Sequence, residues 1–239
     1  MVLTLIINKG GDFTEDYLPV HVFNLFGYNL ELTVNIVVQW VIILIITLIA
    51  IYLTKNLKRV PDKKQSAVET VVETINNLVK ENMGEECKSF VPYIGTLMLF
   101  MLSMNLTGLF GFEAPTKSYG VALGMGLITF SVIQGYTIKK HGIFGYFGGY
   151  AKPFGFLTPL NIIERVMLPV SLSLRLFGNM TAAAVIMGLV YGALRHLSWF
   201  AQIGLPIPLH AYFDIFDGTI QMIIFTMLTM INIKIISEH

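Results

Sequence analysis

Residues 32–53, LTVNIVVQWVIILIITLIAIYL, form an almost uncharged apolar run. About 20 apolar residues, rising about 1.5 Å each, cross the roughly 30 Å hydrocarbon core of a bilayer as an α-helix. The rest of the chain has a similar character, because 54% of its 239 residues are hydrophobic, only 13% are charged and the mean hydropathy is +0.68. This composition is far more apolar than that of a soluble domain. The sequence therefore predicts an integral membrane protein whose first span is residues 32–53.

The charges on either side of this span predict its orientation. Basic residues follow it closely: Lys55, Lys58, Arg59, Lys63 and Lys64. Residues 1–31 carry Asp12, Glu15, Asp16 and Glu31 against one lysine. Because basic residues mark the cytoplasmic side, we expect residues 1–31 to be an external N-terminal segment. With five spans the C-terminus is then cytoplasmic, and a near-neutral net charge of +1 gives no reason to expect nucleic acid as a partner.

Further elements follow from the pattern of apolar residues. Residues 66–82 begin with SAVETVVETINNLVK, whose apolar residues share one helical face, and this is typical of an amphipathic helix at the membrane surface. Residues 90–138 hold two spans, joined by the turn GFEAPTKS at 111–118. The glycine-rich and aromatic residues 142–156, GIFGYFGGYAKPFGF, are predicted to form an interfacial loop.

Residues 160–236 contain two long apolar segments, at about 160–194 and 206–236. As continuous helices of about 30–35 residues they would be roughly 45–52 Å long, well beyond the hydrocarbon core. We expect them to form a helical hairpin that is steeply tilted or bent. The predicted fold is an all-α integral membrane protein, a single membrane domain over 1–239 with five transmembrane helices and one interfacial helix. Gly120 and Gly124 have the spacing of a close helix contact.

The first long segment contains PVSLSLRLFGNM, residues 169–180, with an arginine at its centre. A cation at the centre of a membrane helix costs about 2.5–3.5 kcal/mol on insertion scales, so Arg175 is a functional candidate. Ser171 and Asn179 lie four residues before and after Arg175 and share its helical face. The second long segment has a polar stripe of its own: His210, Asp214, Asp217, Gln221 and Asn232. Two such stripes are expected to line an aqueous path or to face a partner.

These residues also allow other interpretations. Arg175 could be a structural cation paired with Asp214 or Asp217. His210, Asp214 and Asp217 could hold a metal, but a further imidazole or thiolate is missing nearby, so neither a metal nor a cofactor is predicted. Glu113 lies in the outer turn, either as a solvated acid or as part of an ion entrance.

Three motifs together resemble subunit a of the F-type ATP synthase, from about residue 32 to the end of the chain. They are SLSLRLFGNM (171–180), MNLTGLFGFEAPT (104–116) and FDGTIQMIIFTMLTMINI (216–233). The resemblance implies a five-span stator subunit, not catalytic by itself, with two long tilted helices against the ring of c subunits. Further implied partners are the b-type peripheral stalk subunits and, through the stalks, the F1 ATPase sector.

The resemblance also implies roles for particular residues. Arg175 matches the essential arginine of the family, Asn179 the asparagine of the same motif, and Gln221 the glutamine opposite the arginine. Asn105 matches the asparagine of the upstream motif, and Glu113 matches an acid near the outer entrance.

Two positions depart from the pattern of many bacterial relatives. They have a glutamate nine residues after the arginine and a histidine seven before the glutamine, where this chain has Ala184 and Asp214. We interpret Asp214 as the same carboxylate, supplied from the facing helix. His210 and Asp217 have no firm counterpart.

The implied function is ion translocation through two aqueous half-channels that lead to the c-ring carboxylates. Arg175 would separate the half-channels and promote ionisation of the carboxylates. The competing interpretation is a secondary transporter with an ionisable site in mid-membrane, although no internal repeat supports it. We expect a bacterial plasma membrane protein from the chain length and the lack of a transit segment. The coupling ion, H⁺ or Na⁺, is left open because its ligands would lie on the c subunits.

Overall fold

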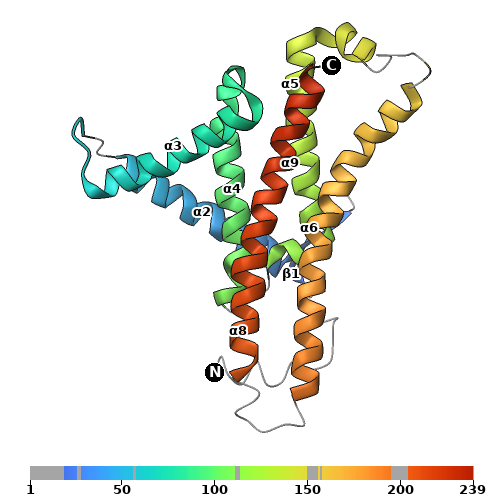
Figure 1. Ribbon diagram of the computed structural model, residues 1–239. Helices are drawn as coiled ribbons and strands as arrows, with labels where there is room; N and C mark the ends of the chain where they lie inside the picture. Colours follow the sequence, from blue (N-terminus) through green and yellow to red (C-terminus); the bar gives the residue numbers. More distant parts are fainter. Residues whose placement is uncertain are drawn as a thin grey trace.

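The computed structural model describes residues 19–25, 28–55, 58–110, 114–149, 156, 158–194 and 204–238. Helices make up its membrane part (Figure 1). Within these residues, five helical segments are long and apolar enough to cross a bilayer: Val34–Thr54, Glu85–Leu109, Tyr119–Gly142, Thr158–Leu194 and Pro206–Ile236. The prediction of an all-α membrane protein with five spans is thereby confirmed.

The helices that build these segments have the following bounds: α2 Val34–Thr54, η2 Glu85–Phe90, α4 Val91–Asn105, η3 Leu106–Phe110, η4 Pro115–Lys117, α5 Tyr119–Gly149, α6 Thr158–Leu194, α8 Pro206–His210, η6 Ala211–Asp217 and α9 Gly218–Glu238. Helix α3, Lys63–Met83, is the amphipathic segment between the first two spans. At 37 residues, α6 is about 55 Å long, which exceeds the hydrocarbon core as expected.

A β-hairpin precedes the first span and was not predicted. Strand β1, Pro19–Leu25, pairs antiparallel with β2, Tyr28–Thr33, with Val22 opposite Glu31. The strand β2 leads directly into α2. The segment before the first span therefore contains local strand structure in addition to the helical membrane part.

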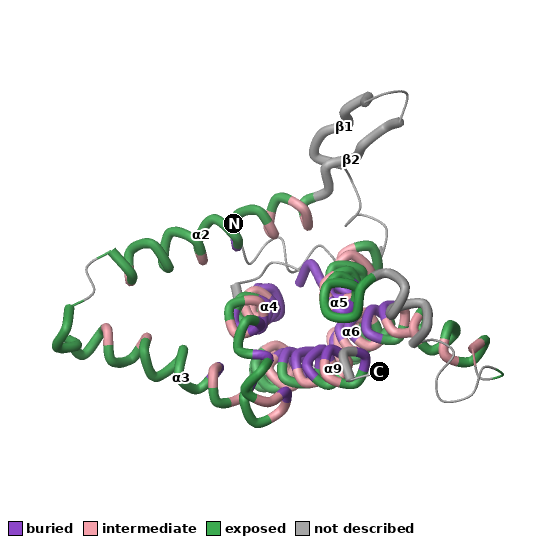
Figure 2. The backbone as a smooth tube through the Cα atoms, turned by 90° about the horizontal axis from the view of Figure 1, so that it is seen from above, coloured by how far each residue is buried: buried purple, intermediate pink, exposed green. Residues whose placement is uncertain are grey.

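Helices α2 and α3 extend away from the other helices and meet at the loop between them (Figure 2). Only Ile42 of α2 is buried, and residues such as Trp40 and Leu44 are about 60% exposed, at 61% and 58%. Lipid is the solvent that makes such a surface favourable. Helix α3 buries Ile75, Val79 and Met83 and exposes most of its polar residues, whereas Val71 and Val72 on its apolar face are 51% and 54% exposed.

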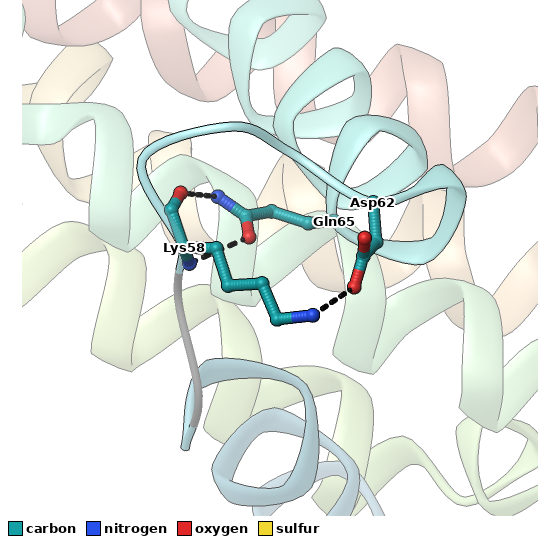
Figure 3. A network of polar contacts seen from close by, with 3 residues as sticks. All are labelled: Lys58, Asp62 and Gln65. Atoms are coloured by element: carbon teal, nitrogen blue, oxygen red, sulfur yellow. Dashed lines mark hydrogen bonds and ion pairs between the residues drawn. The ribbon is translucent and has the colours of Figure 1, made fainter.

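A small polar network fixes the loop between α2 and α3 (Figure 3). The Gln65 side chain accepts a hydrogen bond from the Lys58 N–H and donates one to the Lys58 carbonyl, both at 2.9 Å. The Lys58 ammonium donates to Asp62 at 2.7 Å, and this hydrogen bond raises the pKa of Lys58. The two charged side chains are mostly exposed, so the ion pair adds little stability and the amide of Gln65 provides the more specific restraint.

Helix α9 packs against α3, α4, α5 and α6. One apolar cluster joins α4 to α6 and α9 through Met101, Leu176 and Phe225. A second cluster joins α3, α4, α5 and α9 and includes Ile133 and Ile233. The two clusters leave a polar layer between α6 and α9, which is described below.

The close contact between α5 and α6 does not involve the glycines that the sequence pattern indicated. A Cβ on Gly124 would meet nothing within 4 Å, and one on Gly120 would meet only Ser118 Oγ at 3.8 Å. A Cβ on Gly126 would instead lie 2.7 Å from the carbonyl oxygen of Pro169. Gly126 is therefore the residue that allows α5 to reach the backbone of α6.

We expect Gly126→Ala to separate α5 from α6 and to destabilise the protein by about 1–3 kcal/mol, because a backbone carbonyl is in the way. Gly124→Ala is the matched control on the same helix and should be neutral or slightly stabilising, since alanine favours helix. Thermal unfolding of the purified complex in detergent measures both. Equal midpoints for the two variants would contradict the packing role of Gly126.

Residues 142–156 were predicted to form an interfacial loop, and this prediction is wrong for residues 143–149, which are helical. The chain turns at Gly142, with φ of 73°, and helix α5 then continues to Gly149. A positive φ is accessible to glycine at little cost, so Gly142 ends one helical stretch and starts a second one in a new direction.

Candidate functional site

The last span is interrupted by a π-helical segment, η6, between α8 and α9. The Gly218 N–H donates to the carbonyl of Phe213, five residues back, which is the π pattern. The Thr219 hydroxyl donates to the Ile215 carbonyl at 2.5 Å. Single π turns within helices are often found at functional sites, and this one carries Asp214 and Asp217.

The π turn changes which side chains share a face. Regular α-helical spacing predicted that His210, Asp214, Asp217 and Gln221 occupy one narrow sector. The last span runs without a break from Pro206 to Ile236, but the extra residue in the π turn rotates everything after Asp217 relative to His210. As a result Gln221 is fully buried, whereas the His210 side chain is 44% exposed.

Asn179 and Gln221 meet between α6 and α9. The Asn179 amide donates to Oε1 of Gln221 at 2.6 Å. The exposed fraction of Gln221 is 0%, and its Nε2 has no hydrogen-bond partner in the part of the chain that the structure describes. A buried amide donor without a partner costs about 1–3 kcal/mol, so Gln221 presents an unused donor within the polar layer.

Arg175 lies one turn before Asn179 on α6 and is half-buried. Within the described ranges, no hydrogen bond or ion pair joins Arg175 to Asp214, Asp217 or another side chain. The structural ion pair considered from the sequence is therefore not formed. On α6 the exposed residues nearest to Arg175 in helical spacing are Ser171, Leu174 and Gly178.

Asp214 lies in a second polar group, toward the start of the last span. Its Oδ2 is 3.4 Å from Nδ1 of His210, and Nε2 of His210 is 3.1 Å from the hydroxyl of Tyr191 on α6. The Asp214 side chain is 20% exposed. A Cβ on Gly108 would lie only 2.6–2.8 Å from the three carboxylate atoms, so the backbone of η3 packs directly against them.

Asn105, at the end of α4, holds the C-terminal end of the π segment through a buried hydrogen bond. It is 1% exposed, donates to the Gly218 carbonyl at 2.9 Å and accepts from the Thr116 hydroxyl at 3.3 Å. It therefore ties α4 and η4 to the junction between η6 and α9. Of the other residues singled out from the sequence, Ser171 is exposed and Glu113 lies outside the described residues.

We expect Asn105→Ala to lower the stability of the complex by about 1–3 kcal/mol, because the Gly218 carbonyl and the Thr116 hydroxyl lose a buried partner. The matched control is Ser103→Ala on the same helix, whose hydroxyl bonds only to the Leu99 carbonyl of its own helix. Thermal unfolding and the yield of assembled complex measure both. If both variants unfold at the temperature of the unmodified complex, Asn105 does not support the π segment.

Two residues of the site were missed from the sequence. Gly108 stands inside a quoted motif, but nothing in the motif indicates that it contacts Asp214. Tyr191 is one of several aromatic residues on an apolar helix and has no distinguishing spacing. Among the described residues, no group of three or more His, Cys, Asp or Glu side chains is placed to hold a metal ion.

Five apolar spans with a buried polar layer and a half-buried arginine define a multi-pass membrane protein with a polar site between its last two spans. The family model described as ATP synthase A chain matches residues 36–234, and the chain belongs to this family, the subunit a of the F0 sector.

Similar bacterial proteins cover most of the chain. ATP synthase subunit a, sodium ion specific, of Propionigenium modestum is 33% identical over 87% of this chain and 75% of its own length. ATP synthase subunit a of Moorella thermoacetica is 34% identical over 89% and 93%, and that of Staphylococcus carnosus is 33% identical over 92% and 98%.

Proposed function

We propose that this chain provides the two aqueous half-channels of an F-type ATP synthase and that Arg175 separates them. The observation that carries the proposal is the setting of Arg175, a permanent cation on a long apolar helix with no counter-ion among the described side chains. A mid-membrane cation of this kind is costly unless a charged partner or water faces it. The partner that fits is a carboxylate presented from outside the chain.

The surface of α6 beside Arg175 suits such a partner. Its exposed residues recur every three or four positions: Met167, Ser171, Leu174, Gly178, Ala182, Val185 and Leu189. Three of them are small, and a Cβ on Gly178 would meet nothing within 4 Å. Small residues let a neighbouring membrane helix approach closely. Only 17% of the most apolar stretch of α6 is buried against the rest of this chain. The remaining surface of α6 is free to contact the outer helices of a c ring.

The chemistry follows from the cost of burying charge. A c-subunit carboxylate stays neutral while it faces lipid, because the ionised form is poorly solvated there. Opposite Arg175 the ionised form is favoured, and the carboxylate releases its ion. Rotation then carries the carboxylate to the other half-channel, where it reloads. A membrane potential of 100 mV supplies about 2.3 kcal/mol per elementary charge.

Residues on two levels would line the path. Asn179 and Gln221 lie beside Arg175, while Asp214 and His210 lie nearer the other end of the last span. The other residues that we propose to line the ion path or to support it are Asp217, Ser171, Asn105 and Glu113. The basic residues that follow α2 and those at Lys139 and Lys140 support a proposed topology with the C-terminal end in the cytoplasm and the N-terminus outside. Stalk subunits of the b type and the F1 sector complete the complex.

Co-purification tests the function. An affinity-tagged chain extracted in mild detergent should bring with it a ring of small subunits, stalk subunits and a soluble ATPase. In reconstituted vesicles, the isolated complex should couple ATP hydrolysis to ion uptake. Isolation of the chain alone, with solute transport that does not require ATPase, would support the secondary transporter instead.

A further inference from the structure

The apolar face of helix α3 continues beyond the part of the chain that covers it. Val68, Val71, Val72, Ile75 and Val79 share this face by helical spacing. Ile75 and Val79 are 8% and 0% exposed, because they pack in the cluster that joins α3 to α4, α5 and α9. Val71 and Val72, in the preceding turn, are 51% and 54% exposed. The described part of the chain does not bury these two valines, so a partner from outside the chain is expected to cover them.

Positive charge gathers at the same end of α3. Residues 55–64 contain five basic residues and one acid. Lys63 and Lys64 begin α3, and Lys55 directly follows the last residue of α2. The covalent link to α2 therefore keeps this region where the first span leaves the bilayer. We call Lys55 and residues 58–74 the elbow, and it lies where α2 and α3 meet (Figure 2).

The elbow differs from the other end of α3 in how its lysines are paired. At the far end, Lys80 and Lys88 both form ion pairs with Glu85. Three exposed lysines of the elbow form no ion pair among the described residues: Lys55, Lys63 and Lys64. Their charge is therefore available to an anion from outside the chain.

Helix α3 presents this charge and its acids on different sides. Lys64 lies four residues before Val68, so it stands at the head of the apolar face. Glu69 and Glu73 are both exposed and share another side of the helix. A negatively charged, partly apolar surface would thus meet Lys64 and the valines, while the two acids remain in water.

We propose that the elbow is a binding site for anionic phospholipid. Lys55, Lys63 and Lys64 bind the headgroup phosphate, and the acyl chains pack on Val71 and Val72. Basic residues clustered beside a membrane span attract anionic lipids, and an amphipathic helix lies at the boundary between headgroups and acyl chains. The long aliphatic stem of a lysine lies along apolar surface while its ammonium reaches the headgroups. The site lies outside the residues proposed for the ion path.

The combination of charge and apolar surface favours lipid over other anions. A soluble anion would neutralise the lysines but would leave Val71 and Val72 in water. An acidic protein segment would meet the same lysines, but the exposed valines favour a partner that brings hydrocarbon as well. An anionic phospholipid supplies both groups in one molecule. It would also hold the elbow at a place where α2 and α3 extend away from the other helices (Figure 2).

The test uses the whole complex in phosphatidylcholine vesicles that contain a small amount of phosphatidylglycerol with a photoreactive acyl chain. After illumination, peptide mass spectrometry should find the label in residues 66–74. Lys63→Gln combined with Lys64→Gln should lower this labelling at least fivefold, since one basic residue near an anionic surface contributes about fivefold in affinity. Salt at about 1 M should have a similar effect, because the Debye length is then only about 3 Å.

Two further variants separate the parts of the site. Val71→Gln combined with Val72→Gln keeps the charges and should also lower the labelling, because the acyl chains lose their contact. The matched control is Lys139→Gln combined with Lys140→Gln, which removes two exposed lysines at another helix. It should leave labelling of the elbow unchanged. Unlabelled phosphatidylglycerol should compete with the probe, and phosphatidylcholine should not.

Loss of labelling in the Lys63, Lys64 variant but not in the control supports the proposal. Equal loss in both variants would mean that general positive charge attracts the lipid, and equal labelling by a phosphatidylcholine probe would mean that the headgroup is not recognised. Either result overturns the proposal. Loss of a stalk subunit from the Lys63, Lys64 variant, with labelling unchanged, would place a protein on the elbow and would overturn it too. None of these results bears on the role of Arg175.

Discussion

Arg175→Ala is expected to abolish ATP synthesis and ion-coupled hydrolysis while the subunit still folds and assembles. Arg175 has no partner among the described side chains, so its removal strands no buried counter-charge. Removing a cation from mid-membrane even relieves a cost of about 2.5–3.5 kcal/mol on insertion scales. Arg175→Ala should therefore abolish ATP synthesis while leaving the stability of the folded subunit unchanged or slightly higher.

Arg175→Lys should be nearly as damaging, although it keeps the charge. A guanidinium is planar, always protonated and donates in a fixed fork, whereas an ammonium is a compact charge that loses its proton more readily when buried. ATP-driven proton pumping in vesicles and the amount of assembled complex are the two measurements. The matched control is Arg59→Ala, in the exposed loop before α3. Normal pumping in Arg175→Lys would refute the role of this residue.

The membrane helices could be predicted because their signal is local. Twenty apolar residues in a row specify a span whatever their neighbours, and α2 and α6 begin and end within two residues of the predicted bounds. The approach of Asn179 to Gln221 also follows from simple rules, since two polar side chains on adjacent apolar helices are stabilised by bonding to each other.

The features that were missed depend on tertiary contacts. Residues 211–217, AYFDIFD, fit a regular α-helix by sequence, and the π turn is stabilised in part by Asn105, more than 100 residues away. Gly126 differs from Gly124 only in what the opposite helix presents to it. A contact such as that between Tyr191 and His210 depends on the relative depth of two helices, which no spacing in the sequence encodes.

Asp214→Asn is expected to reduce ATP-driven proton pumping by about 10²-fold or more, because the amide keeps the shape but cannot carry a proton. The Gly108 backbone packs against the carboxylate, so the similar size of asparagine matters and folding should be preserved. Gly108→Ala tests the same site from the other side. The new Cβ would lie 2.6 Å from Oδ1 of Asp214 and would force the carboxylate to move. We expect a partial loss of pumping, although the acid is still present. Asp62→Asn, in the exposed loop, is the control for the change of charge.

A second substitution separates a relay from a purely structural acid. Ala184 lies on α6 and is half-buried, at the position where many relatives have a glutamate. If Asp214 supplies that acid from the facing helix, Ala184→Glu combined with Asp214→His should recover part of the pumping lost in Asp214→Asn. The introduced glutamate would face the same aqueous path from α6, and the introduced imidazole would face it from the last span. If Asp214 serves only to hold His210, the double variant should be at least as defective as the single one, because the imidazole would then lose its acidic neighbour. Pumping rates per assembled complex, compared between the single and double variants, distinguish the two roles.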